Sequence, residues 1–358
     1  MSDNTLLQKI KILISKKLNY IPFDIHWLPF GSKIIIAGET FNSKGIIQLY
    51  NLMKGRLHLE KEYIRDFPIK RCSLGISSFS SSDFALGDFE GNFQIFDFER
   101  GKCNLDIKNA HDGMIYGIDS IGGKNGPGSP EVVTGGKDGL VKVWDIRSGK
   151  PSLILEPKGI ENEKNYPECW CVAFGGIGMG EHSDQKKLGI GYNNGDFKIF
   201  DLRMDKVLYA ENLNNGICSI DFDSKNANLN KMIVTTLSSK VYLFDVNYDN
   251  YSNINVDSKY NFKYKRLYDD VNTTVWGTKF LPQNRNIFAT LGGNGFLNLY
   301  DYNNNDFLDE IYKHNKKLRL LSNNKISSGP IIGFDWHYLK NGLACLISLD
   351  NIVKICKI

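Results

Sequence analysis

The chain has 358 residues, of which 42% are apolar, and its 44 Lys and Arg residues against 40 Asp and Glu residues give a formal charge of +4. This balance excludes a protein that binds nucleic acid through a dense positive surface, and the apolar fraction excludes a globally disordered chain. No apolar run approaches the roughly 20 residues that a membrane-spanning helix needs, so we expect no membrane association. The length permits two or three ordinary domains or one large repetitive domain.

The first predicted element covers residues 8–15, where apolar and polar residues alternate as in a β-strand. The alternative for this segment is a loose amphipathic helix. We predict no secretion signal, because Lys9, Lys11, Lys16 and Lys17 interrupt the apolar residues. Together with seven cysteines, an odd number, this predicts reduced thiols in the cytoplasm.

From residue 23 onward, one unit recurs seven times. Each unit contains a turn dipeptide and an alternating strand whose last position lies six residues after the first turn residue. Asp138-Gly139 followed by Trp144 is the clearest copy, and Lys44-Gly45 followed by Tyr50 is one of two degenerate copies. The seven last positions are Tyr50, Phe96, Trp144, Phe200, Phe244, Tyr300 and Cys356. Gly or Asn at the second turn position tolerates the positive φ of a tight turn, so the pattern predicts β-hairpins.

Each turn is preceded by two further strand-like segments, and no amphipathic helix interrupts the series. Seven units of three or four strands predict an all-β, seven-bladed β-propeller that occupies residues 1–358 as a single domain. Since the last unit reaches residue 358 without a fourth strand, we expect residues 8–15 to complete the last blade and close the ring. Two Asn- and Lys-rich segments, 247–260 and 302–328, are expected to be long solvated loops beside blades five and six.

The third unit carries four side chains suited to a buried hydrogen-bonded network, namely His111, Thr134, Asp138 and Trp144. Imidazole, hydroxyl, carboxylate and indole N–H can form one continuous chain of donors and acceptors. The same residue types could form a catalytic His–Asp pair with a Thr nucleophile. We favour the structural network, because a network that ends on a Trp is a packing device.

The sequence offers little support for a metal or cofactor site. Cys169 and Cys171 place two thiols two residues apart, but no second Cys pair or nearby His completes a tetrahedral site, so we interpret them as small core residues. The glycine-rich segment 176–180 lacks the helix of a dinucleotide-binding loop, and no phosphate-binding loop occurs. We therefore predict no metal, no cofactor and no enzymatic activity.

The first position of each innermost strand is the feature most informative for function. These positions are equivalent in the register of the seven units, so their side chains should surround one mouth of the central channel. The seven are Phe23, Lys70, Tyr116, Trp170, Cys218, Trp276 and Ile332. Four are aromatic, and aromatic side chains offer large contact areas at low entropic cost. We predict a protein-binding surface here; the alternative is ordinary packing at the tops of the blades.

Residues 136–145, which read Gly-Lys-Asp-Gly-Leu-Val-Lys-Val-Trp-Asp, resemble the signature of WD-repeat (WD40) proteins. Longer segments resemble a narrower family, the Monad-type WD-repeat proteins known as axonemal dynein assembly factors. These segments are residues 45–50, 169–175, 191–203, 215–219, 274–276 and 281–285. The likeness covers nearly the whole chain, which differs in its Asn- and Lys-rich outer loops and lacks the conventional Trp at several strand ends.

The resemblance implies a non-catalytic scaffold in the cytoplasm, a monomeric subunit of a larger complex whose partners are proteins. It implies that the chain acts together with a RuvB-like ATPase and prefoldin-like co-chaperone assembly, and with dynein chains. A second function stays open, because Trp144-Asp-Ile-Arg147 and Phe200-Asp-Leu-Arg203 resemble the aromatic-Asp-x-Arg element of substrate receptors of cullin-type ubiquitin ligases. Against it, an Arg two residues after such a strand often pairs only locally.

Overall fold

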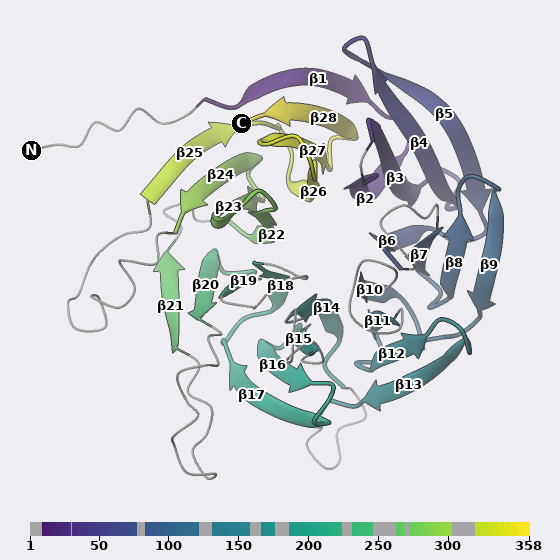
Figure 1. Cartoon of the computed structure of the whole chain (residues 1–358), viewed down its shortest axis with the longest axis vertical. Helices are drawn as coiled ribbons and strands as arrows, with labels where there is room; N and C mark the ends of the chain where they lie inside the picture. The colour runs from purple at the N-terminus through teal and green to yellow at the C-terminus, as the bar shows by residue number, and fades with distance from the viewer. Residues whose placement is uncertain are drawn as a thin grey trace, which may run out of the picture.

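A computed structural model describes residues 9–29, 31–76, 83–121, 131–157, 166–175, 186–223, 231–245, 263–268, 273–302 and 319–358. These residues form 28 strands in seven four-stranded antiparallel sheets, which stand around a central axis like the blades of a propeller (Figure 1). The predicted all-β, seven-bladed fold is therefore confirmed. Within the described stretches, no helix has the length and apolar character needed to cross a membrane.

In blades one to six the strands run from the channel outward in chain order. Blade one contains β2 (Ile21–Trp27), β3 (Lys33–Glu39), β4 (Gly45–Met53) and β5 (Arg56–Arg65). Blade two contains β6 (Ile69–Leu74), β7 (Asp83–Asp88), β8 (Phe93–Asp97) and β9 (Lys102–Ile107). Blade three contains β10 (Ile115–Ile121), β11 (Glu131–Gly136), β12 (Val141–Asp145) and β13 (Lys150–Leu155). Blade four contains β14 (Cys169–Gly175), β15 (Lys187–Tyr192), β16 (Asp196–Asp201) and β17 (Lys206–Asn212).

The remaining blades follow the same order until the ring closes. Blade five contains β18 (Ile217–Phe222), β19 (Lys231–Thr236), β20 (Lys240–Asp245) and β21 (Lys263–Tyr268). Blade six contains β22 (Val275–Leu281), β23 (Asn284–Gly292), β24 (Phe296–Asp301) and β25 (Arg319–Lys325). Blade seven contains β26 (Ile331–Trp336), β27 (Leu343–Ser348), β28 (Ile352–Lys357) and, outermost, β1 (Lys11–Lys17).

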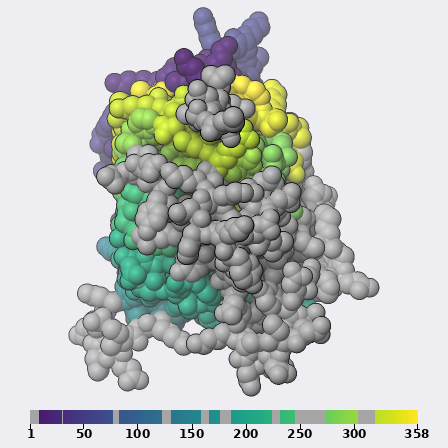
Figure 2. All heavy atoms as spheres, turned by 90° about the vertical axis from the view of Figure 1, so that its left-hand side faces the viewer, coloured from purple at the N-terminus to yellow at the C-terminus, as the bar shows by residue number. Residues whose placement is uncertain are grey.

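The two ends of the chain share blade seven, so the predicted ring closure is confirmed. β1 runs antiparallel to β28, from Lys11 opposite Lys357 to Lys17 opposite Ile352. In Figure 2 the purple N-terminal strand lies beside the yellow C-terminal strands at the top of the molecule. The expected range of 8–15 is displaced toward the N-terminus, because pairing begins only where β28 ends, at Lys357.

The hairpin turns carry the positive φ values that the pattern predicts. Gly139 has a φ of 78°, and Ser239 and Asn351 accept φ values of 63° and 61° at the same turn position. In blade one the expected turn at Lys44-Gly45 is wrong: Gly45 already begins β4, and Ser43 takes the positive φ. Its turn is longer, closed by hydrogen bonds between Thr40 and Lys44, and this moves the tight bend upstream of the glycine.

The core lies between neighbouring blades, where six of the seven last positions of the repeating unit are buried and Tyr300 is half-buried. The Trp144 ring of blade three lies 5.2 Å from the Phe93 ring of blade two, and the Phe244 ring of blade five lies 5.2 Å from the Phe197 ring of blade four. All four side chains are at most 3% exposed. Each last position thus fills the space between its own blade and the preceding one, which holds adjacent sheets together by apolar burial.

Of the two expected loops, 247–260 lies outside the described residues. The loop expected over 302–328 is wrong for residues 319–325, which form β25. β25 pairs with β24 from Arg319 opposite Asp301 to Lys325 opposite Phe296. The sequence did not predict this strand because apolar and polar residues do not alternate in it; hydrogen bonds with β24 and the packing of Leu321 hold it in place.

Candidate functional site

Every innermost strand has a β-bulge at the position predicted to face the channel mouth. In β10, Ile115 pairs with Gly136 and Gly117 pairs with Gly135, so Tyr116 is the extra residue of the bulge and has no partner in the register. The same irregularity falls on all seven predicted positions: Phe23, Lys70, Tyr116, Trp170, Cys218, Trp276 and Ile332. The seven positions are therefore structurally equivalent, and a bulge redirects its side chain away from the regular pleat. Their role in binding stays a prediction.

The channel contains a cavity of about 190 Å³ with walls from all seven innermost strands. Five of the seven predicted residues line it: Tyr116, Trp170, Cys218, Trp276 and Ile332. Trp276 is 38% exposed, Tyr116, Trp170 and Ile332 are half-buried, and Cys218 is buried. The accessible part of this surface is therefore aromatic and aliphatic, and it faces an open space rather than a packed core.

The structure does not bring Phe23 and Lys70 to the cavity. The Lys70 Nζ atom lies 4.9 Å from the centre of the Phe23 ring, and that ring lies 5.3 Å from the ring of Phe89. Burial, together with the neighbouring Arg71 charge, lowers the pKa of Lys70 to about 8. These two residues pack against each other at the junction of blades one and two, which fits the packing interpretation for them.

Trp170 and Trp276 are held in place by their surroundings. The Trp170 indole N–H donates a hydrogen bond to Glu168 Oε2 at 2.9 Å. A Cβ atom on Gly216 would lie 2.9 Å from the Trp170 ring, and one on Gly293 would lie 3.3 Å from Trp276 Nε1. Glycine at both points therefore lets the indoles lie close against the backbone.

Below the mouth, aspartates on innermost strands connect neighbouring blades. We call Asp24, Asp119, Asp221 and Asp335 the interblade carboxylates. Each accepts a hydrogen bond from a backbone N–H on the innermost strand of the next blade, at N···O distances of 2.6–2.9 Å. The bonds run from Cys72 to Asp24, from Phe174 to Asp119, from Phe280 to Asp221 and from Trp27 to Asp335. Such charge-assisted bonds are stronger than neutral ones, so they stabilise the ring around its inner wall.

Near Asp24 the channel wall gathers a mixed cluster that sequence reasoning missed. Asp24 Oδ2 lies 3.3 Å from His26 Nε2, and Asp24 Oδ1 lies 3.7 Å from Arg71 Nη1. The ligand atoms of Asp24, His26 and Cys72 all lie within 4.8 Å of one another. No spacing in the sequence predicts this three-residue group, because Cys72 belongs to the next blade and lies 48 residues from Asp24.

The charges of this wall compensate one another. Burial opposes the charge on Asp24, but the His26 and Arg71 cations more than offset it and hold its pKa well below the usual range. Burial likewise disfavours a charged His26, yet the Asp24 carboxylate raises its pKa well above the usual value. Burial and the Asp24 charge together raise the pKa of the Cys72 thiol to about 11. At neutral pH the protein thus has a charged Asp–His pair beside a neutral thiol.

In blade three the structure brings the four network residues together. Trp144 Nε1–H donates to Thr134 Oγ1 at 2.8 Å, and Thr134 Oγ1 lies 2.7 Å from His111 Nε2. His111 Nδ1 lies 2.9 Å from Asp138 Oδ1. Since the Thr hydroxyl accepts from the indole, it donates to Nε2, and the imidazole then donates from Nδ1 to Asp138. The network spans the blade and is buried except at Asp138.

Blade seven uses a different set of partners at the same turn. Asp350 accepts hydrogen bonds from the hydroxyls of Ser327, Ser328 and Ser348. Burial would raise the pKa of Asp350, but these hydroxyls outweigh it and lower the pKa to about 2. A carboxylate at the hairpin turn is therefore retained where the Trp and His of blade three are absent.

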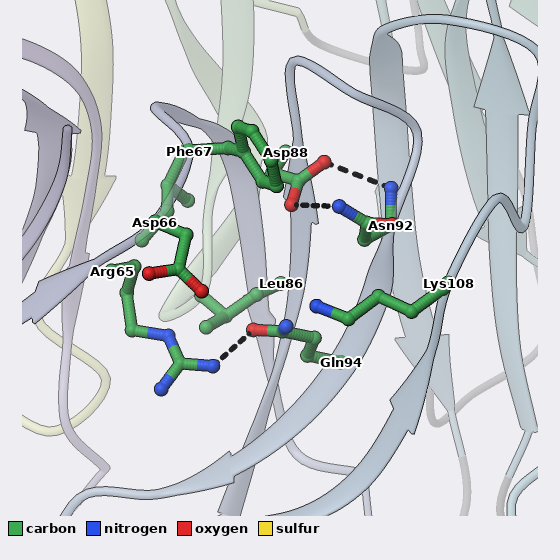
Figure 3. Close-up of a pocket in the computed structure, with 9 residues that line it drawn as sticks. Arg65, Asp66, Phe67, Leu86, Asp88, Asn92, Gln94 and Lys108 are labelled. Atoms are coloured by element: carbon green, nitrogen blue, oxygen red, sulfur yellow. Dashed lines mark hydrogen bonds between the residues drawn. The ribbon is translucent and has the colours of Figure 1, made fainter. Parts of the chain in front are cut away.

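A second, much smaller pocket lies between blades one and two (Figure 3). Arg65 Nη2 donates to Gln94 Oε1 at 2.8 Å, and the Asp88 carboxylate accepts from the side chain and the backbone N–H of Asn92. The pocket has a volume of about 10 Å³, which is room for one water molecule at most. We therefore do not interpret it as a ligand site.

In both copies of the aromatic-Asp-x-Arg element, the Arg residue forms a hydrogen bond with the Asp two positions before it. Arg147 Nε and Nη2 donate to Asp145 at 3.3 and 3.4 Å, although the side chain is 71% exposed. In the second copy, the Arg203 backbone N–H donates to Asp201 at 2.9 Å. The Arg147 contacts match the local pairing weighed against the ligase interpretation, whereas the Arg203 contact involves only its backbone N–H.

A closed ring of seven four-stranded sheets with a His–Thr–Trp–Asp network in one blade defines a WD-repeat β-propeller. The chain is 35% identical to dynein axonemal assembly factor 10 of Homo sapiens over 355 residues, which cover 96% of this chain and 94% of that protein. The counterpart in Chlamydomonas reinhardtii is 33% identical over 351 residues, with the same coverage. The chain therefore belongs to the dynein axonemal assembly factor 10 family.

Two other comparisons with known proteins give less information. A guanine nucleotide-binding protein subunit beta of Oryza sativa subsp. japonica is 26% identical over 144 residues, which cover 40% of this chain. No protein-family model matches the chain. The near-full-length likeness to the assembly factors is thus the more informative of the comparisons.

Proposed function

We propose that the chain is a non-catalytic scaffold in the cytoplasmic assembly of axonemal dynein, where it works with a RuvB-like ATPase and a prefoldin-like co-chaperone. The observation that carries the proposal is the likeness to dynein axonemal assembly factor 10 along 96% of the chain. The absence of a long unmatched segment supports a shared role for the whole propeller rather than for one blade.

The proposed partner surface is the channel mouth formed by Tyr116, Trp170, Trp276 and Ile332. These side chains come from four different blades, line one cavity, and stand at equivalent bulges. Exposed, preorganised aromatic residues have the properties of interface hot spots. Phe23, Lys70 and Cys218 take no direct part in this proposal, because they are packed or buried.

Affinity purification of the tagged full chain, followed by mass spectrometry, tests the proposed role. We expect enrichment of the RuvB-like ATPase, of prefoldin-like subunits and of dynein heavy chains. Enrichment of a cullin-ligase adaptor that is lost in an R147A/R203A variant, without any of these proteins, would instead support the ubiquitin-ligase alternative.

The surface is tested with the double variant Trp170→Ala and Trp276→Ala. We expect its affinity for the captured co-chaperone to fall by about 30-fold or more, the loss expected when hot-spot side chains are truncated. Phe41→Ala is the matched control, since Phe41 is an aromatic residue that is 70% exposed on the turn of blade one. Unchanged binding by the folded double variant would remove the channel mouth from the proposal and leave the assembly role to another surface.

A further inference from the structure

We propose that Asp24, His26 and Cys72 form a binding site for one divalent transition-metal ion of the Zn²⁺ type in the wall of the channel. The three side chains offer one carboxylate oxygen, one imidazole nitrogen and one sulfur, which are the ligand atoms that Zn²⁺ prefers. Among the described residues, no other group of three His, Cys, Asp or Glu side chains comes this close together.

The geometry of the metal-free cluster is near that of a tetrahedral site. Ligand atoms about 2.0–2.1 Å from a tetrahedral ion lie about 3.3–3.4 Å apart, and His26 Nε2 lies 3.3 Å from Asp24 Oδ2. One ligand atom of each of the three residues lies within 4.8 Å of the other two, so the Cys72 sulfur has to approach by at most about 1 Å to reach the third vertex. His26 Nε2 is buried and has no aligned hydrogen-bond partner, and a metal ion would use this nitrogen.

The surroundings supply the outer contacts that metal sites usually have. His26 Nδ1 faces Asp335 Oδ2 at 3.8 Å, and a carboxylate behind a histidine ligand orients the imidazole. Asp24 Oδ1 faces Arg71 and accepts the Ile25 backbone N–H, and Oδ2 accepts the Cys72 backbone N–H at 2.9 Å, so an ion would use the remaining lone pair of Oδ2. The Asp24 carboxylate is therefore restrained in a suitable orientation before any ion binds.

The channel cavity also supplies the fourth position. All three residues line this cavity of about 190 Å³, which provides room for a water ligand and a path of entry. Binding requires a thiolate and an unprotonated imidazole nitrogen, so any proton on Cys72 Sγ or His26 Nε2 leaves to solvent.

Titration of the chelator-treated full chain with Co²⁺ tests the site. We expect one equivalent to bind with a near-ultraviolet thiolate-to-cobalt absorption band, and Zn²⁺ to displace it. Cys72→Ser should abolish the band, and His26→Gln should weaken binding by at least about 10-fold. Cys171→Ser is the matched control, because Cys171 is another buried cysteine in the wall of the same cavity and should leave the band unchanged.

X-ray absorption of the Zn²⁺-loaded wild-type protein provides a measurement that does not depend on the folding of a variant. We expect one sulfur at about 2.3 Å and nitrogen or oxygen ligands at about 2.0–2.1 Å. A first shell without sulfur, the absence of a Co²⁺ band in the folded wild type, or loss of the band in the Cys171 variant would each overturn the proposal.

Discussion

Blade three and the channel wall are stabilised by two different kinds of polar network. In blade three, hydrogen bonds from Trp144 through Thr134 and His111 to the Asp138 carboxylate join strands of one sheet and the loop that precedes it. In the channel wall, aspartates accept backbone N–H groups from the neighbouring sheet. The first network stabilises a blade, and the second stabilises the junctions between blades.

The blades differ in their internal hydrogen bonds, whereas several junctions between blades share one kind of hydrogen bond. Only blade three has the full His–Thr–Trp–Asp set, whereas the interblade carboxylates occur in blades one, three, five and seven. At the junction of blades two and three a contact between the hydroxyls of Ser73 and Ser120 at 2.8 Å takes the place of a carboxylate. Each blade that lacks the internal network is thus still joined to at least one neighbour by a polar contact between innermost strands.

The largest effect is expected from Trp144→Ala. This change removes the indole that packs on Phe93 and donates to Thr134, so it leaves both a cavity and an unpaired hydroxyl. We expect the free energy of unfolding to fall by about 3–5 kcal/mol in a denaturant titration. Trp144→Phe should recover part of the loss, since it restores apolar volume without the N–H. An unchanged unfolding curve would show that blade three does not depend on its network.

A smaller effect is expected from Asp335→Ala in the channel wall. The change leaves the Trp27 N–H without its acceptor and removes the carboxylate 3.4 Å from Lys279 Nζ. We expect a loss of about 2–3 kcal/mol in the free energy of unfolding. Asp335→Asn, which keeps an oxygen acceptor, should lose less. Equal stability of the Ala variant and the wild type would contradict a stabilising role for this junction.

The smallest effect concerns pH and the Asp350 network of blade seven. Three serine hydroxyls lower the folded-state pKa of Asp350 to about 2 from the ordinary value of 3.8. A lowered carboxyl pKa stabilises the fold above the ordinary pKa, and this stabilisation is lost as the pH falls toward 2. We expect Asp350→Asn to cost about 1 kcal/mol near pH 6. Thermal melts should show this difference shrinking between pH 4 and pH 2; a difference that persists at pH 2 would exclude the carboxylate charge as its source.

Much of the fold follows from short-range patterns. The Asp138-Gly139 turn and the alternation up to Trp144 predict a hairpin because both depend on residues a few positions apart. The pattern fails at Lys44-Gly45, where a longer turn shifts the bend to Ser43, and at residues 319–325, where pairing with β24 stabilises a strand of weak alternation. The first error reflects local hydrogen bonds between Thr40 and Lys44 that the dipeptide pattern does not capture, and the second reflects pairing with a neighbouring strand.

The candidate site was only partly predictable. Equal spacing identified seven equivalent positions, and the bulges show why they are equivalent. Spacing could not separate Trp276, which faces the cavity, from Phe23, which packs under Lys70, because both hold the same place in the repeat. The neighbouring side chains, which differ from blade to blade, decide which of these positions is accessible.

By itself, the sequence determined the number of blades, the hairpins, the blade-three network and the family resemblance. These features depend on turn preference and on a period of two residues, which act along a single stretch of chain. Only the tertiary structure decided which charges meet in the channel. Closing the ring places Asp335 against Trp27, 308 residues away, and the packing of blade two against blade one places Cys72 against Asp24. Contacts across blades depend on the closed geometry of the whole ring, so no local pattern encodes them.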